Sequence, residues 1–544
     1  MVELFTAKSG APSLKVDGIA LHSPYDPVRE ARRFVQESLG RETPSVVVIL
    51  GECVGHLSQA VAEAHPRALV LPVVYSPEIT VAAGLPRRDV WDPSGPGALE
   101  EYLRARVGEL QVEGLRVLEW PPSARAFPTA SRAANEAVRR VVQELNGSFV
   151  TTVAAGRLWL RNCLSNFLYL DEVLAGPRSA PGRPIVVAAP GPSLELAAAA
   201  IEGARGRIAL WALPSSCPFL LDRGLQPDLV VMTDPGYYAL HHLHFAAPAC
   251  PVVMPLSAAR GCWALSPRPA AIFLEQPFLV ERSLLSAAGV KAPWVAPHGT
   301  VTATAVELAL SCTDGPVILA GLDLGSRDLL THARPNAFDA LLHRESSRLL
   351  PHLGQWFARD ADLGSFTVPG SAGFRSTTAL RTYAGWLEDG LQATRGRLYR
   401  LLPSPQALSS MQPLDERDLQ DLLSPFPAGG GTPAGDRLRG YPDAARRREI
   451  AGRLIREWRD AVRAAHRGLG GGLGGGLAGD SQEGQDLGAQ PLVLDLAHMI
   501  SPRHVVDALR RSRRGQAAAA RDSAAQALAE SEQVLRDLAE KLGA

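Results

Sequence analysis

An apolar run from Val186 to Ala189 ends in a Gly-Pro-Ser turn, and this turn opens an alanine-rich segment. Such an order of strand, turn and helix restricts the chain to an α/β fold, because the helix must pack back on the sheet. The backbone N–H groups at the start of the helix and the Ser193 hydroxyl would point to whatever lies above the strand end. We therefore expect Gly191, Pro192 and Ser193 to hold an anionic ligand. An ordinary helix N-cap is the alternative role of Ser193.

A second apolar run, from Leu229 to Met232, leads to Asp234. Open α/β sheets bind their ligands at the carboxyl ends of the strands, and Asp234 lies at such an end. Its carboxylate can accept hydrogen bonds from ribose or sugar hydroxyls, or it can bind a divalent cation. The alternative is a structural turn before Pro235-Gly236. Together the two strand ends predict a nucleotide pocket.

The rest of the chain repeats this alternation and indicates three regions. Apolar strands are expected at 185–189, 208–212, 229–233, 252–255, 271–274 and 317–320. Their continuous apolar character predicts a doubly wound parallel sheet covered on both faces, in a central domain over 178–390. The N-terminal region, 1–177, has a strand at 46–50, a helix at 57–64 and a strand at 68–75, which predict a Rossmann-like domain. Glycine-rich linkers and charged helical segments predict a helical C-terminal region over 391–544.

Further candidate residues follow the later strands. Gly299 and Thr300 begin a helix with small and hydroxylic residues, which suits either a second anion site or tight packing of helix on sheet. Asp323 ends a buried strand, where a carboxylate needs a ligand or a hydrogen-bond network. His332 lies in a polar loop and can act as a general base, because imidazole titrates near neutral pH. His298 is the competing base.

Composition limits the classes of partner. The 544 residues contain 56 basic and 56 acidic side chains, so no overall charge favours nucleic acid. No lysine follows a glycine-rich loop, which excludes a P-loop nucleotide site. Six cysteines without a C-x-x-C pair suit neither a zinc site nor a disulfide framework, and no run of apolar residues is long enough for a membrane span. We expect a cytoplasmic protein.

Several motifs resemble those of the Maf family, the motility-associated factor glycosyltransferases, and of the related 6-hydroxymethylpterin diphosphokinases with an MptE-like domain. The resemblance is carried by the Gly-Pro-Ser-Leu turn at 191–194, an ILxGxDL strand at 318–324 and Thr331-His332-Ala333. The motif LHSPYDPVREA at 21–31 and RLWLRN at 157–162 are similar to the same family outside its centre. A fainter similarity to family 42 sialyltransferases implies a sialyltransferase-like central fold. Pro190 stands where those enzymes have an asparagine, so one ligand hydrogen bond is not carried over.

The resemblance implies an activity. A Maf-type enzyme would transfer a nonulosonic acid sugar from a CMP-activated donor to Ser or Thr of flagellin, with inversion, without a metal and without a cofactor beyond that donor. His332, His298 and Asp234 would then be catalytic, while Gly191, Pro192, Ser193, Asp234, Gly299, Thr300 and Asp323 would bind the nucleotide sugar. An ATP-dependent diphosphokinase acting on a pterin is one alternative, and it would need Mg²⁺. A non-catalytic flagellar assembly factor that keeps only the fold is another.

Overall fold

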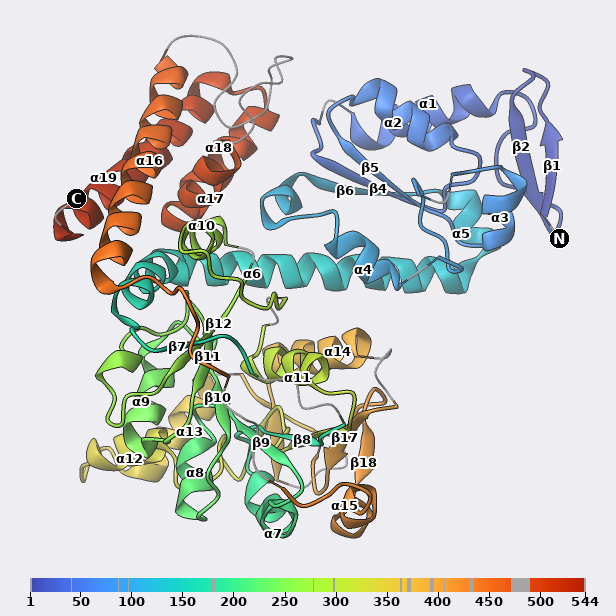
Figure 1. The fold of residues 1–544 in the computed structure, drawn as a ribbon. Coiled ribbons are helices and arrows are strands. Elements are labelled where there is room, and N and C mark those ends of the chain that lie inside the picture. Colours follow the sequence, from blue (N-terminus) through green and yellow to red (C-terminus); the bar gives the residue numbers. More distant parts are fainter. Residues whose placement is uncertain are drawn as a thin grey trace. The chain divides into compact units, whose positions relative to one another are not determined.

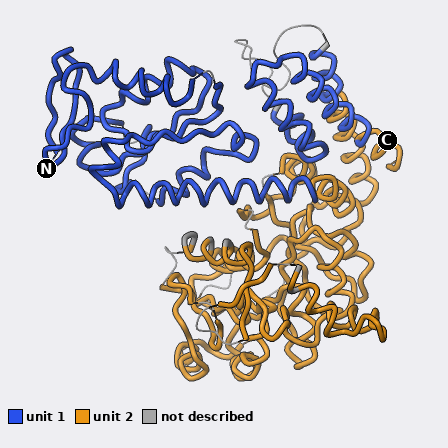
Figure 2. Tube along the Cα trace, turned by 180° about the vertical axis from the view of Figure 1, so that it is seen from behind, with its two compact units in different colours: residues 1–154, 461–534 blue, residues 155–460, 535–544 orange. Residues whose placement is uncertain are grey.

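A computed structural model describes residues 2–40, 42–86, 88–95, 97–177, 182–276, 278–296, 299–362, 364–368, 373–391, 396–405, 407–429, 435–470 and 490–542. The chain forms two compact units (Figure 2). Unit 1 combines residues 1–154 with 461–534, and unit 2 combines residues 155–460 with 535–544. Three helices continue from one unit to the other, namely α6 (Pro128–Tyr169), α16 (Ala444–Gly470) and α19 (Ala517–Leu542).

Unit 2 is built on a parallel sheet of nine strands in the order β18-β17-β13-β8-β9-β10-β11-β12-β7. The strands are β7 (Val173–Leu174), β8 (Ile185–Ala188), β9 (Ala209–Ala212), β10 (Leu229–Val231), β11 (Val252–Pro255), β12 (Ala271–Leu274), β13 (Val317–Ala320), β17 (Leu398–Leu401) and β18 (Gln412–Leu414). Every residue of β8, β9 and β13 is buried. The prediction of a doubly wound parallel sheet is confirmed.

Helices flank this sheet on two sides (Figure 1). One face carries Val187, Trp211 and Leu319, which share a core with α11 (Val301–Cys312) and α14 (Thr378–Gly390). Figure 1 shows α7 (Leu194–Ala204) and α15 (Glu416–Leu423) on the opposite side. The other helices of the unit are α8 (Cys217–Asp222), α9 (Tyr237–Ala246), α10 (Leu279–Ala287), α12 (Ala337–Arg344) and α13 (His352–Asp362). A small antiparallel sheet of β14 (Ser326–Arg327), β16 (Phe374–Ser376) and β15 (Phe366–Thr367) follows β13.

Unit 1 contains a smaller parallel sheet in the order β5-β4-β6. Its strands are β4 (Val46–Leu50), β5 (Leu69–Val73) and β6 (Leu115–Glu119). Alternate residues of β4 face opposite cores: Val47 and Ile49 pack with α1 (Pro27–Leu39) and α2 (His56–Ala64), whereas Val46 and Val48 pack with α4 (Leu99–Arg104) and α6. This three-layer arrangement is the Rossmann-like packing that the sequence predicts. An antiparallel sheet, β1 (Val2–Thr6), β2 (Pro12–Val16) and β3 (Ile19–Ala20), precedes it.

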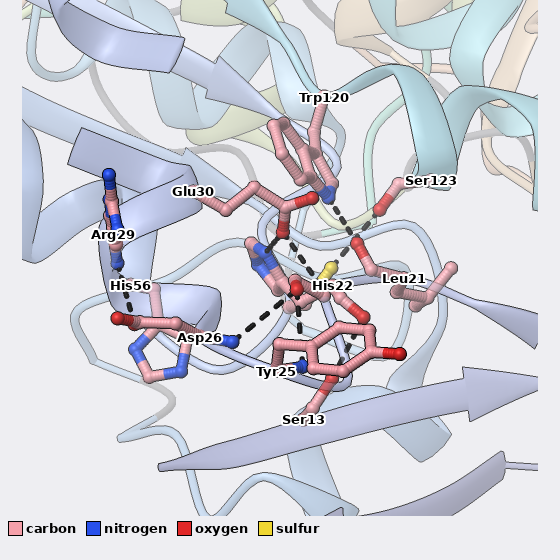
Figure 3. A network of polar contacts seen from close by, with 12 residues as sticks. Ser13, Leu21, His22, Tyr25, Asp26, Arg29, Glu30, His56, Trp120 and Ser123 are labelled. Carbon is pink, nitrogen blue, oxygen red and sulfur yellow. Dashed lines mark hydrogen bonds and ion pairs between the residues drawn. The ribbon is translucent and has the colours of Figure 1, made fainter. Parts of the chain in front are cut away.

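The motif at 21–31 forms the turn that starts α1 (Figure 3). Glu30 accepts a hydrogen bond from Ser23 N at 2.8 Å and lies 3.1 Å from His22 Nδ1. Asp26 caps the helix by accepting from Arg29 N at 2.9 Å. The ring of His22 lies 4.8 Å from that of Trp120, centroid to centroid. These polar side chains therefore stabilise the start of α1.

The C-terminal region is mainly helical, as predicted, but β17 and β18 also lie within residues 391–544 and belong to the large sheet of unit 2. Within unit 1, α17 (Gln490–Ile500), α18 (Pro502–Arg513) and part of α19 form a small core of Ala497, Val505 and Ala527 against Leu110. Leu528 of α19 is fully buried. Among the described residues, no helix combines the length and the apolar character needed to cross a bilayer.

Candidate active site

A cleft of about 390 Å³ opens beyond the carboxyl ends of β8 and β13, which are neighbours in the large sheet. It lies within unit 2. The turn after β8, the start of α11, the segment after β13, helices α12 and α13, and the start of α14 all contribute to it. The lining residues used below are Pro190, Gly191, Thr300, Thr302, Asp323, Thr331, His332, Phe338, Trp356, Arg359, Ser365 and Arg375.

The turn after β8 is closed by Asp323 from the end of β13. Ser193 donates to this carboxylate twice, with its backbone N–H at 2.6 Å and with its hydroxyl. The other N–H groups of the turn are also used, because Ala189 N donates to Ala320 O and Gly191 N to Gly321 O. The expectation that these donors are left free for an anion is therefore wrong in this structure. Asp323 is only 2% exposed, and this burial raises the pKa of its carboxyl group, while the bonds from Ser193 oppose that shift.

Gly191 is required by the same close packing. A Cβ at this position would lie 2.5 Å from Gly321 O and 2.7 Å from the carboxyl carbon of Asp323. Gly321 has a positive φ of 72° and would bring its own Cβ within 2.2 Å of Ala189 O. The glycines thus let the two strand ends touch each other.

The start of α11 is an open helix N-terminus at the cleft. Thr300 is the N-cap and accepts a hydrogen bond from Ala303 N at 3.2 Å. No acidic side chain lies in the first turn, and both Thr300 and Thr302 line the cleft. The positive end of the helix dipole therefore faces the space in which a ligand would bind. Gly299 packs against the ring of Tyr383 instead, since a Cβ there would come within 2.6 Å of it.

His332 lies on the same cleft and is held there by its neighbours. Ala333 N donates to Pro190 O at 2.8 Å, and Arg334 N donates to Glu195 Oε1 at 2.8 Å. The Nδ1 atom of His332 lies 2.7 Å from the hydroxyl oxygen of Thr331. Burial lowers the pKa of His332 to about 4, so its imidazole is neutral at physiological pH and can accept a proton.

An aromatic cluster supports that imidazole. The ring of Phe338 lies 5.3 Å from that of His332, and the ring of His242 lies 6.0 Å from it in a stacked arrangement. His242 belongs to α9, is 3% exposed and has a pKa that burial lowers to about 3. The Nδ1 atom of His242 has no hydrogen-bond partner among the described residues. The base therefore lies against uncharged rings.

Two arginines complete the cleft, and sequence reasoning missed both. Arg375 of β16 donates to the hydroxyl and the carbonyl oxygen of Ser365, each at 2.7 Å. The guanidinium of Arg359 lies 5.9 Å from the ring centre of Trp356, one turn earlier in α13. Neither arginine lies in a recognisable motif. Only the fold of the segment after β13 brings them to the strand ends, so no local signal marks them.

Three other predicted site residues, Asp234, Pro192 and Gly299, do not line the cleft. Asp234 is exposed and accepts a hydrogen bond from Gly236 N at 2.6 Å, which is the turn role named as its alternative. Its strand, β10, is separated from β8 by β9. Pro192 and Gly299 are not among the lining residues. His298 lies outside the described residues. The structure therefore gathers Gly191, Thr300, Asp323 and His332, with Ser193 behind them.

Comparisons with known proteins agree with this architecture. Residues 160–328 match the sequence model of the family described as 6-hydroxymethylpterin diphosphokinase MptE-like. Two uncharacterized proteins of Treponema pallidum (strain Nichols) are 27% identical over 247 residues and 28% identical over 120 residues. These alignments cover 44% and 22% of this chain, and 53% and 57% of the relatives. The chain therefore spans about half the length of the curated relatives it matches.

A solved structure covers nearly the whole chain. The Maf glycosyltransferase from Magnetospirillum magneticum AMB-1 superimposes with a TM-score of 0.52 at 16% identity, over 99% of this chain and 90% of that one. At this identity the likeness concerns the fold. The chain thus carries an MptE-like domain and has the fold of a Maf glycosyltransferase, as its motifs predict.

Proposed function

We propose that this protein is a Maf-type glycosyltransferase that moves a nonulosonic acid sugar from a CMP-activated donor to Ser or Thr of flagellin. One observation carries the proposal: the open N-terminus of α11 and the neutral imidazole of His332 line the same cleft. The first suits the phosphate of a leaving nucleotide, and the second suits the removal of a proton from an acceptor hydroxyl. The fold shared with a Maf glycosyltransferase supports it.

In this proposal each ligand group has a complementary side chain. The donor phosphate lies at Thr300 and Thr302, where the helix dipole stabilises the charge that develops as CMP leaves. The carboxylate of the sugar pairs with Arg375 and Arg359. Asp323 accepts hydrogen bonds from donor hydroxyls while its bonds to Ser193 hold the turn after β8.

The chemical step needs one base. His332 takes the proton of the acceptor hydroxyl, and the hydroxyl oxygen bonds to the anomeric carbon of the sugar. The bond from that carbon to the phosphate oxygen breaks, its electron pair leaves with CMP, and the configuration inverts. Because a single phosphate leaves against a helix N-terminus, no metal is required by this scheme. We place the reaction in the cytoplasm, where the six buried cysteines, which form no disulfide, stay reduced.

A diphosphokinase is the second candidate, favoured by the name of the family that residues 160–328 match. Transfer from ATP needs Mg²⁺ held by oxygen ligands, commonly carboxylates. Of the described residues that line the cleft, Asp323 alone is acidic. Asp234, which the diphosphokinase reading would use as a further ligand, lies elsewhere. The oxygen ligands that the cleft offers therefore fit Mg²⁺ poorly, and we derive no step of a diphosphokinase reaction from them.

The two candidates differ in an assay with purified protein. With a CMP-nonulosonic acid donor and flagellin we expect a gain in flagellin mass that survives EDTA. With ATP and 6-hydroxymethylpterin we expect no AMP, with or without Mg²⁺. Mg²⁺-dependent AMP without sugar transfer would favour the diphosphokinase, and no product in either assay would favour the non-catalytic assembly factor.

A further inference from the structure

A carboxylate behind the cleft connects three segments that contribute to it. Asp339 lies in the first turn of α12, directly after Phe338, whose ring contacts that of His332. Asp339 itself is not among the residues that line the cleft. Its backbone N–H donates to the side chain of Asn336 at 2.9 Å, so that Asn336 caps the helix. The carboxylate of Asp339 contacts residues of the neighbouring segments instead.

The first contact is with the loop that carries the base. Arg334 follows His332 by two residues; its Nη2 atom donates to Asp339 Oδ1 at 3.3 Å, and its Nε atom lies 3.3 Å from Oδ2. The backbone N–H of Arg334 donates to Glu195 of α7. The side chains of Arg334 and Asp339 are 39% and 25% exposed, so solvent screens this ion pair only in part. The loop is therefore connected to α12 through a side chain and to α7 through its backbone.

The second contact is with α13. Trp356, which is 4% exposed and lines the cleft, donates its indole N–H to Asp339 Oδ1 at 3.3 Å. His352, one turn earlier, has its Nε2 atom 2.7 Å from the same oxygen and 3.3 Å from the indole nitrogen. The ring of Trp356 also lies next to the guanidinium of Arg359. One carboxylate oxygen therefore holds the helix that brings Trp356 and Arg359 to the cleft.

The charge of Asp339 allows all these contacts at once. A carboxylate accepts several hydrogen bonds and meets a guanidinium with both oxygens, whereas an amide has a single acceptor oxygen and no charge. An asparagine at this position could keep the contact with Trp356 or His352, but it would leave Arg334 without its counter-charge. Removing the charge should therefore separate the loop of His332 from α13.

We propose that Asp339 is a positioning residue, which holds the base His332 and the cleft wall at Trp356 in a fixed arrangement. The inference rests on the proposed function, in which His332 removes the proton of the acceptor hydroxyl. Asp339 touches neither donor nor acceptor in this scheme and acts only through the side chains it holds. Because a misplacement of about 1 Å can lower a rate by about 100-fold, its effect falls on kcat more than on donor binding.

Hydrogen exchange followed by mass spectrometry tests these contacts on the full chain without any reaction. Asp339→Asn keeps the size of the side chain and removes its charge. We expect faster exchange than in the wild type in residues 331–335 and 352–359, and unchanged exchange in β13. Asp228→Asn is the matched control, because Asp228 also pairs with an arginine, Arg205 at 2.9 Å, and does not line the cleft. It should leave exchange in 331–335 and 352–359 as in the wild type.

Unchanged exchange in both segments of a folded Asp339→Asn variant would overturn the proposal. If that variant does not fold, Arg334→Gln replaces it, since this change removes the contact with the loop and leaves Asp339 in place. It should accelerate exchange in 331–335, and exchange at the wild-type rate there would overturn the proposal equally.

Kinetics separate positioning from general support of the fold. Asp339→Asn should lower kcat by about tenfold or more, while CMP affinity in calorimetry changes by less than about threefold, because the start of α11 is intact. In a His332→Gln background the same substitution should lower kcat by less than about twofold, since the base is already absent. Equal losses in both backgrounds would mean that Asp339 does not act through His332 and would overturn the proposal. A wild-type protein that transfers no sugar would refute the proposed function, whereas the exchange experiment would still decide whether Asp339 connects the segments.

Discussion

His332 shows how one side chain acquires its chemical state from its surroundings. Its imidazole lies against the rings of Phe338 and His242, and burial outweighs any interaction that would favour a charge. A neutral ring is the form that accepts a proton, and the contact between Nδ1 and Thr331 fixes how the ring is oriented. The histidine thus remains a base at pH values where a solvent-exposed one would be protonated.

The pH dependence of kcat/KM should show that His332 is neutral. Because the pKa of His332 is lowered to about 4, the base stays unprotonated as the pH falls through 6.5, and kcat/KM should be level from pH 8 to about pH 5.5. It should fall only as the pH approaches 4. His332→Gln should lower kcat by roughly 10²- to 10⁴-fold, whereas His343→Gln, at an exposed histidine of α12, should not. A decline in wild-type activity centred near pH 6.5 would contradict this assignment.

Among the elements, two helices of unit 2 begin beside the same strand ends but differ in what occupies their N-termini. The start of α7 meets the carboxylate of Asp323, an anion supplied by the chain itself. The first turn of α11 contains no acidic side chain, and the start of this helix faces the cleft. A helix N-terminus favours negative charge in either case, so the start of α11, unlike that of α7, is available for a ligand.

A pair of substitutions at the N-cap of α11 can separate ligand binding from helix stability. Asp and Asn cap helices about as well as Thr, so Thr300→Asp and Thr300→Asn should both leave the melting temperature near that of the wild type. Only the aspartate adds a negative charge where we place the donor phosphate. We expect it to weaken CMP binding by about tenfold or more in titration calorimetry, a cost of about 1.4 kcal/mol. Equal affinities of the two variants would mean that the phosphate binds elsewhere.

The sequence predicts the helices and strands of this region but not how they meet at the cleft. The apolar runs and the turns after them predict the strands and the helices correctly, because both depend on neighbouring residues. Whether the turn at Ser193 is free depends on Asp323, which is 130 residues away in the chain. Arg359 and Arg375 reach the cleft through a helix and a small sheet that no local pattern orients toward it. Long-range pairing of this kind is the part that one sequence does not reveal.

At the scale of the whole molecule, the two compact units do not follow the order of the chain. Residues 461–534 belong with residues 1–154, and Val505 of α18 shares a core with Leu110 of the N-terminal region. Polar contacts add to this association, since Arg510 forms an ion pair with Glu113 and His498 Nε2 lies 3.1 Å from Glu109 Oε2. The charged helices near the C-terminus give no sign of this arrangement in the sequence, because residues they contact, such as Glu113, lie some 400 positions earlier.

Segments of one compact unit should lose their structure together. Val505 and Leu419 are both fully buried, the first in unit 1 and the second in α15 of unit 2, so aspartate at either position puts a charge into a core. In hydrogen exchange followed by mass spectrometry, Val505→Asp should accelerate exchange in β4, more than 450 residues away in sequence, and spare β13. Leu419→Asp should accelerate exchange in β13 and spare β4. If either variant accelerated exchange equally in β4 and β13, the chain would unfold as one cooperative body and the division into two units would be wrong.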